Sequence, residues 1–97
     1  MLALAFPACA GGSEEAMGKT IFTKTAQPSC TLCHALKDAG SSAEIGPNLD
    51  ELKPDAERVA KAVKDGLGIM PAFGESLSDE QIKAVAHYVA RATGAAK

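Results

Sequence analysis

The residues that could carry chemistry are concentrated in one five-residue stretch, Cys30-Thr31-Leu32-Cys33-His34. Two cysteines separated by two residues and followed directly by a histidine are typical of covalent c-type haem attachment. In that chemistry each thiol adds across a haem vinyl group, and the adjacent histidine ligates the iron. The stretch therefore predicts one haem c, attached through Cys30 and Cys33, with His34 as an iron ligand.

A haem held in this way has a sixth iron position, for which the chain must supply a second ligand. Met70 stands in an apolar stretch rich in glycine and proline, residues 66–74, and Pro71 stiffens the chain directly after it. Met17 falls on an amphipathic helical row, where a methionine ordinarily fills the core. His87 lies one step off an apolar helical stripe and is expected in solvent, and Met1 belongs to a predicted leader. Met70 is therefore predicted to be the second iron ligand.

Length and composition limit the kind of protein this can be. A chain of 97 residues forms one domain, and its side chains alone would give a marginal core. Three Phe, one Tyr and no Trp leave the aromatic filling thin, so a haem would supply the large apolar centre. The net charge of −2 and the lack of a basic stripe argue against a nucleic-acid partner. No apolar run is long enough to cross a bilayer.

Residues 1–10 resemble the end of a secretory signal, because they are uncharged and mostly apolar. Ala8-Cys9-Ala10 has the small-x-small form of a cleavage site, although a positively charged region before it is missing. Cys9 has two interpretations, a lipid-acceptor cysteine in a loose lipobox or a residue of a discarded leader. In bacteria c-type haem is attached outside the cytoplasm, which agrees with export. We expect a periplasmic protein with a single domain over residues 11–97.

Hydrophobic periodicity and capping residues predict an all-α chain with four helical segments and no strand. The first helix begins at Ser13, where Glu14 and Glu15 suit the helix dipole. Gly18 in this helix either is tolerated or marks a close helix contact. A short second helix is predicted after the haem signature, through Lys37 and ending near residue 40.

Residues 38–53 are polar and rich in turn residues, which predicts a loop with Ile45 and Leu49 turned inward. The third helix starts near Pro54 and presents an apolar stripe that includes Val59 and Val63. It ends at Gly66, and the apolar loop 66–74 that follows must lie against something hydrophobic. The fourth helix carries a capping box, Ser78 with Gln81, and ends at Gly94.

The chain resembles the class I c-type cytochromes, in particular the short soluble cytochromes of bacterial respiration and oxygenic photosynthesis. The matching pieces lie in the family's order between residues 17 and 92. They are Gly18-Lys19-Thr20-Ile21-Phe22, the haem signature, Gly46-Pro47-Asn48-Leu49, Met70-Pro71-Ala72-Phe73, and Leu77-Ser78-Asp79-Glu80-Gln81-Ile82 running on to Val85-Ala86-His87-Tyr88-Val89. The resemblance implies the cytochrome c fold, with three to five short helices around the haem. It also implies that the terminal helices cross where Gly18 and Phe22 meet Tyr88.

In this family the carbonyl of the proline that matches Pro47 accepts a hydrogen bond from the ligand histidine, which fixes the orientation of the ring. The predicted cofactor-binding residues are Cys30, Cys33, His34, Ile45, Pro47, Leu49, Val59, Val63, Met70 and Phe73. No lysine-rich ring surrounds the haem signature, unlike in the mitochondrial proteins. The sequence therefore gives no reason to expect charge-steered docking to a strongly acidic partner.

The predicted function is that of a periplasmic one-electron carrier of a respiratory chain, not an enzyme, with His34 and Met70 on the iron. Its partners would be redox proteins, such as an oxidase, reductase or dehydrogenase, met by a monomer in transient complexes. The loop around Ile69, Ala72 and Phe73 is the predicted docking patch. Alternatives are a small cytochrome subunit of a periplasmic dehydrogenase complex and a haem peroxidase or gas-sensing module with a labile sixth ligand. A zinc site or a thiol–disulfide oxidoreductase fits less well, because a second ligand pair and a βα framework are lacking.

Overall fold

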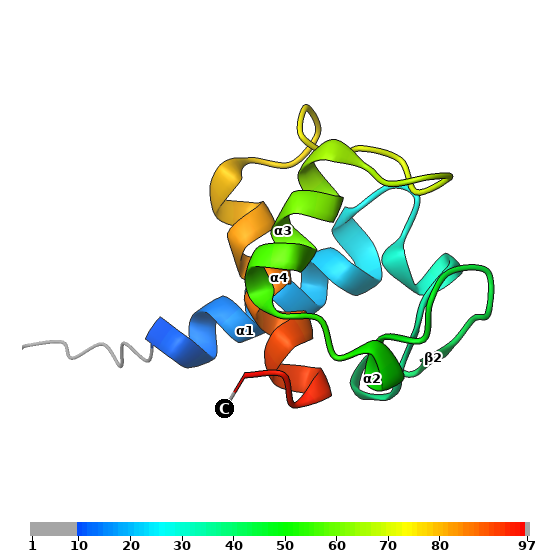
Figure 1. Ribbon diagram of the computed structural model, residues 1–97. Coiled ribbons are helices and arrows are strands. Elements are labelled where there is room, and N and C mark those ends of the chain that lie inside the picture. Colours follow the sequence, from blue (N-terminus) through cyan, green and yellow to red (C-terminus); the bar gives the residue numbers. More distant parts are fainter. Residues whose placement is uncertain (1–9, 97) are drawn as a thin grey trace, which may run out of the picture.

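The computed structural model describes residues 10–96 of the chain (Figure 1). Met1 and Cys9 lie outside the described residues, so both interpretations of Cys9 stay predictions. The fold has three longer helices, α1 (Ala10–Thr20), α3 (Ala56–Asp65) and α4 (Asp79–Thr93). The all-α fold class is confirmed. None of the described helices combines the length and the apolar character needed to cross a membrane.

The first and last helices cross at Gly18, as the resemblance implied (Figure 1). A Cβ atom on Gly18 would lie 2.5 Å from the Cβ of Tyr88 and closer still to the carbonyl oxygen of Ala84. Phe22 lies in the π-helix η1 (Ile21–Thr25), which continues α1. Its ring meets that of Tyr88 edge to face, with centroids 5.9 Å apart. Glycine at position 18 is therefore what allows the two helices to approach each other this closely.

The start of α1 differs from the prediction. The helix begins at Ala10, three residues before the predicted start at Ser13. Glu14 reaches across to α4, where its Oε1 atom lies 2.9 Å from Nδ1 of the half-exposed His87. Acidic side chains expected to serve the helix dipole thus take part in contacts between helices. Met17 is 41% exposed, so the prediction that it fills the core is wrong.

The segment after the haem signature is not the predicted helix through Lys37. The 3-10 helix η2 (Cys30–Leu32) is followed by strand β1 (Ala35–Leu36), a second 3-10 helix, η3 (Lys37–Ala39), and strand β2 (Ser41–Ser42). The two strands pair antiparallel, with Leu36 opposite Ser41. Leu36 is fully buried. Burying this side chain in the core draws the backbone into an extended pair, which overrides the local helix preference.

Residues 38–53 form a loop as predicted, apart from the end of η3, strand β2 and one short helix, α2 (Leu49–Leu52). The Asn48 side chain caps this helix by accepting hydrogen bonds from the backbone N–H groups of Asp50 and Glu51. Leu49 is buried, as expected, whereas Ile45 is 65% exposed. The prediction that Ile45 turns inward is therefore wrong as a statement about burial.

Helix α3 begins at Ala56, after Asp55 has capped it through a 2.8 Å hydrogen bond from the Arg58 backbone N–H. Pro54 precedes this cap and so does not lie in the first turn as predicted. Val63 is buried and Val59 half-buried on the inner face. Gly66 ends the helix with φ of +79°, a conformation that favours glycine.

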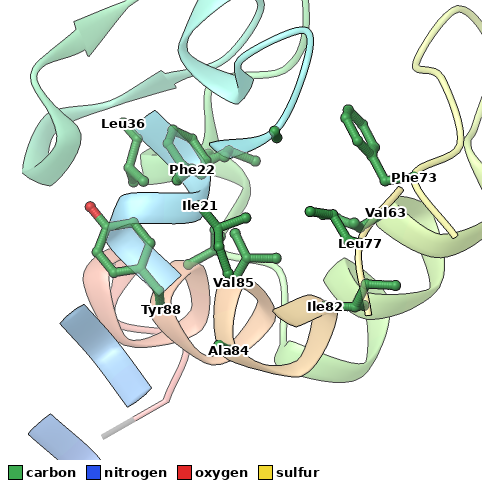
Figure 2. Packing of buried hydrophobic residues seen from close by; sticks show 13 residues of the cluster. Ile21, Phe22, Leu36, Val63, Phe73, Leu77, Ile82, Ala84, Val85 and Tyr88 are labelled. Carbon is green, nitrogen blue, oxygen red and sulfur yellow. The ribbon is translucent and has the colours of Figure 1, made fainter. Parts of the chain in front are cut away.

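Helix α4 matches its prediction closely. The Ser78 hydroxyl accepts from the Gln81 backbone N–H while the Gln81 side chain accepts from the Ser78 backbone N–H. Gly94 ends the helix with φ of +86°. In Figure 2, Phe22 and Phe73 lie apart, and the side chain of Val85 projects from α4 below them. All three of these side chains also line the cavity of the candidate site.

Candidate haem site

One cavity of about 330 Å³ gathers the residues that were predicted from scattered parts of the chain. All of the predicted cofactor-binding residues lie on its walls, namely Cys30, Cys33, His34, Ile45, Pro47, Leu49, Val59, Val63, Met70 and Phe73. They come from η2 and the two residues after it, from residues 45–49 at the start of α2, from α3 and from the loop after α3. The walls are apolar apart from a few groups, which suits a large hydrophobic macrocycle.

His34 is held in a defined orientation at this cavity. Its Nδ1 atom lies 2.8 Å from the carbonyl oxygen of Pro47, so the hydrogen bond implied by the resemblance is present. A carbonyl oxygen can only accept, which makes Nδ1 the donor and leaves the lone pair on Nε2 for a metal. Gly46 makes the approach possible, because a Cβ there would lie 2.9 Å from Cε1 of the ring.

The Cys30 thiol is buried in a way that disfavours its thiolate form. Burial raises the pKa of the Cys30 thiol to about 11, and the neighbouring Cys33 adds to this effect. A disulfide oxidoreductase needs the opposite, a cysteine whose lowered pKa keeps it as the thiolate. No three histidine, cysteine, aspartate or glutamate side chains of the described residues lie together in a way that could hold a metal ion. The set of donor groups at the cavity fits a haem joined to two sulfurs.

Met70 is carried by a short loop that is tied down at both ends. Leu67 and Met70 exchange two backbone hydrogen bonds, of 3.1 and 3.0 Å, around a turn that contains Gly68 with φ of +62°. Further along, the Phe73 backbone N–H donates to the carbonyl of Val63 at 2.7 Å. These bonds fasten the loop to the end of α3 and hold the thioether at the cavity wall.

The same loop corrects part of the predicted docking patch. Ile69 is 87% exposed and Ala72 is also exposed. Phe73 is only 4% exposed and packs into the hydrophobic core. Phe73 therefore cannot be a surface contact, because its ring is the anchor that holds the loop against the protein.

Arg58 was not singled out from the sequence, and Gly46 was named only as part of a matching piece. Among residues 10–96, Arg58 is the only lysine or arginine on the walls, and it lies one helical turn before Ala62, which also lines the cavity. This four-residue spacing on α3 could have revealed it. Gly46 gave no such signal, since its importance depends on where the distant His34 ring comes to rest.

Comparisons with known proteins identify the family of this chain. Residues 13–89 match the protein family described as cytochrome c oxidase, cbb3-type, subunit III. The chain belongs to this family and is a small class I c-type cytochrome. It is 37% identical to cytochrome c6 of Microcystis aeruginosa, over 74% of this chain and 89% of the relative. It is also 37% identical to cytochrome c6 of Rippkaea orientalis, over 86% and 73%.

A solved structure shows the same fold. The crystal structure of the c-type cytochrome SorU from Sinorhizobium meliloti superposes with a TM-score of 0.82 at 54% sequence identity, covering 86% of this chain and 94% of that one. The cytochrome described here is therefore an electron carrier with a covalently bound c-type haem, attached through Cys30 and Cys33 of the signature. Such a carrier exchanges electrons with redox partners.

Proposed function

We propose that this cytochrome is an exported, periplasmic one-electron carrier in which His34 and Met70 are the two axial iron ligands. The observation that carries the proposal is the presence of both side chains on the walls of the cavity that also holds Cys30 and Cys33. Imidazole and thioether are the ligand pair that raises the reduction potential of c-type haems. The haem, when bound, supplies an iron that takes up and releases one electron.

The protein's own residues keep that exchange simple. The Pro47 carbonyl holds the His34 ring by its Nδ1–H, and the anchored loop 66–74 keeps Met70 in place. Little movement is then needed between the two oxidation states, so the energy of reorganisation stays small. The apolar walls exclude water from most of the cofactor, and Arg58 offers the carboxylates of the haem a cationic partner at the cavity.

Docking to redox partners is proposed to use the exposed apolar side chains beside the cavity. Ile69 is on the loop that carries Met70, and Ile45 and Leu67 also line the cavity while exposing most of their surface. A small apolar patch of this kind suits the brief encounters of redox proteins. It would serve a free shuttle of a respiratory chain and a subunit of a periplasmic dehydrogenase complex equally well.

Export is supported by the character of residues 1–10 and by the chemistry of attachment, which bacteria perform outside the cytoplasm. A peroxidase or gas-sensing module would need an open or readily displaced sixth position. The hydrogen bonds that tie down the loop around Met70 favour a filled one.

The proposal is tested with Met70→Ala in the haem-loaded protein. Removing the thioether is expected to let carbon monoxide or imidazole bind the iron and to lower the midpoint potential. Met17→Ala is the matched control, because Met17 lies on α1, is 41% exposed and is not part of the cavity wall. If Met70→Ala neither bound these ligands nor changed the potential, the proposed ligation would be wrong.

A further inference from the structure

Ser41 makes two short contacts with the backbone of the haem-attachment segment. Its half-buried hydroxyl lies 2.6 Å from the carbonyl oxygen of His34 and 3.0 Å from that of Thr31. A serine hydroxyl has one proton to donate, so the two carbonyls share it, with the shorter contact to His34. This places Ser41 against the main chain of the residue that we propose as an axial ligand.

The contact completes a clamp made by residues 41–47 on residues 31–34. The Gly46 backbone N–H donates to the carbonyl of Cys33 at 2.6 Å, and the Pro47 carbonyl accepts from the His34 ring at 2.8 Å. Together with Ser41, the clamp satisfies the carbonyls of Thr31, Cys33 and His34 and also fixes the imidazole. Both the main chain and the ring of His34 are therefore held by the same stretch of chain, residues 41–47.

We infer that Ser41 is a positioning residue for His34: by holding the His34 carbonyl it keeps the ring aligned on the Pro47 acceptor. The inference rests on the proposed axial role of His34. The imidazole and the carbonyl group that accepts from Ser41 are attached to the same Cα atom of His34. Movement of this carbonyl is therefore expected to tilt the imidazole away from Pro47. The hydrogen bond from Nδ1 of His34 to the Pro47 carbonyl makes the imidazole a stronger electron donor to the iron and so favours the ferric state. Weakening this bond is therefore expected to raise the midpoint potential of the haem.

The test uses four variants of the haem-loaded protein. Ser41→Ala removes the hydroxyl, and Ser42→Ala is the control next door. Ser42 is exposed, and its hydroxyl forms no hydrogen bond within residues 10–96. Ser41→Val and Ser41→Thr form a second pair of nearly equal volume that differs only in the hydroxyl, so the effect can be separated from packing.

The first readout is hydrogen exchange of the His34 Nδ1 proton in the ferrous protein, followed by NMR. A typical hydrogen bond contributes about 1 kcal/mol to the stability of the structure around it. Loss of the bond from the Ser41 hydroxyl is therefore expected to speed exchange of the His34 Nδ1 proton by roughly fivefold. We expect this acceleration in Ser41→Ala and Ser41→Val, and wild-type exchange in Ser41→Thr and Ser42→Ala. The midpoint potential is expected to shift upward in the same two variants only.

Equal exchange and equal potential in Ser41→Thr and Ser41→Val would overturn the inference. If Ser41→Ala did not load haem, Ser41→Thr and Ser41→Val would still test the role of the hydroxyl. Faster exchange of the His34 Nδ1 proton in both of these variants would count against the inference. The near-infrared sulfur-to-iron band of the wild-type ferric protein separates the two proposals. If that band is absent, the proposed ligation fails. If it is present and exchange is unaffected, only the role of Ser41 fails.

Discussion

Replacing Gly46 by alanine would place a methyl group against the ring of His34. The added Cβ would lie 2.9 Å from Cε1 and 3.0 Å from Nδ1, whereas ordinary van der Waals contact begins at 3.4 Å. The φ angle of Gly46 is not in the left-handed region, so the effect comes from space alone. To escape the methyl group, the ring must retreat by about 0.5 Å.

A retreat of that size weakens the bond to Pro47. Its length of 2.8 Å would grow toward the outer limit of about 3.2 Å for N–H···O hydrogen bonds. If the whole net contribution of ~1 kcal/mol is lost from the ferric state, the midpoint potential rises by about 40 mV, since 59 mV corresponds to a factor of ten for one electron. The direction is upward because the bond strengthens the ligand.

The assay is a spectroelectrochemical titration of the haem-loaded Gly46→Ala protein. Gly18→Ala is the control, because it forces a methyl group between α1 and α4 and makes no contact with His34. The control should keep the wild-type potential even though it is less stable. A potential that is unchanged or lowered in folded Gly46→Ala would refute the link between the ring position and the iron.

Three further predictions concern stability, pH and docking. Gly18→Ala should reduce the free energy of unfolding by about 2 kcal/mol in urea titrations. The reason is that overpacking costs up to ~3 kcal/mol, which outweighs a gain in helix propensity of about 1 kcal/mol. The control Thr20→Ala, on the exposed side of α1, should not lower the free energy of unfolding. The pKa of Tyr88 is raised by burial and by its 2.6 Å hydrogen bond to Asp38, so its contribution to stability is complete below pH ~10 and is lost as the pH rises further. Tyr88→Phe should flatten this alkaline decline in unfolding free energy, and an unchanged slope would speak against it. Ile69→Asp should slow electron transfer to a partner by about tenfold, because a loss of ~1.4 kcal/mol in binding energy at the interface lowers affinity by that factor. The haem spectrum should stay the same. Equal transfer rates in Ile69→Asp and the wild-type protein would count against the docking patch.

Features set by neighbours in the chain could be predicted well. The capping box of Ser78 with Gln81 and the glycine stop at Gly94 are local, so they marked α4 almost to the residue. The haem signature is equally local. Given that signature, a methionine in an apolar loop is a candidate iron ligand, and Met70 does line the same cavity as His34.

Features set by tertiary contacts could not be predicted from the local pattern of the chain, and the two that were expected, the crossing at Gly18 and the bond from His34 to Pro47, came from the family resemblance. Leu36 leaves the helical pattern because the core takes its side chain, and this produces the small strand pair. Glu14 finds His87 across the helix crossing, a partner that periodicity within α1 cannot reveal. Ser41 matters because a loop folds back on the haem signature, and nothing in its immediate neighbours announces that contact.

The near-infrared spectrum of the ferric protein tests the central claim most directly, because a sulfur-to-iron charge-transfer band requires a thioether on the metal. We expect the band in the wild-type protein and in Met17→Ala, and its loss in Met70→Ala. A wild-type spectrum without the band, or a band that survives in Met70→Ala, would contradict the assignment of His34 and Met70 as the axial pair.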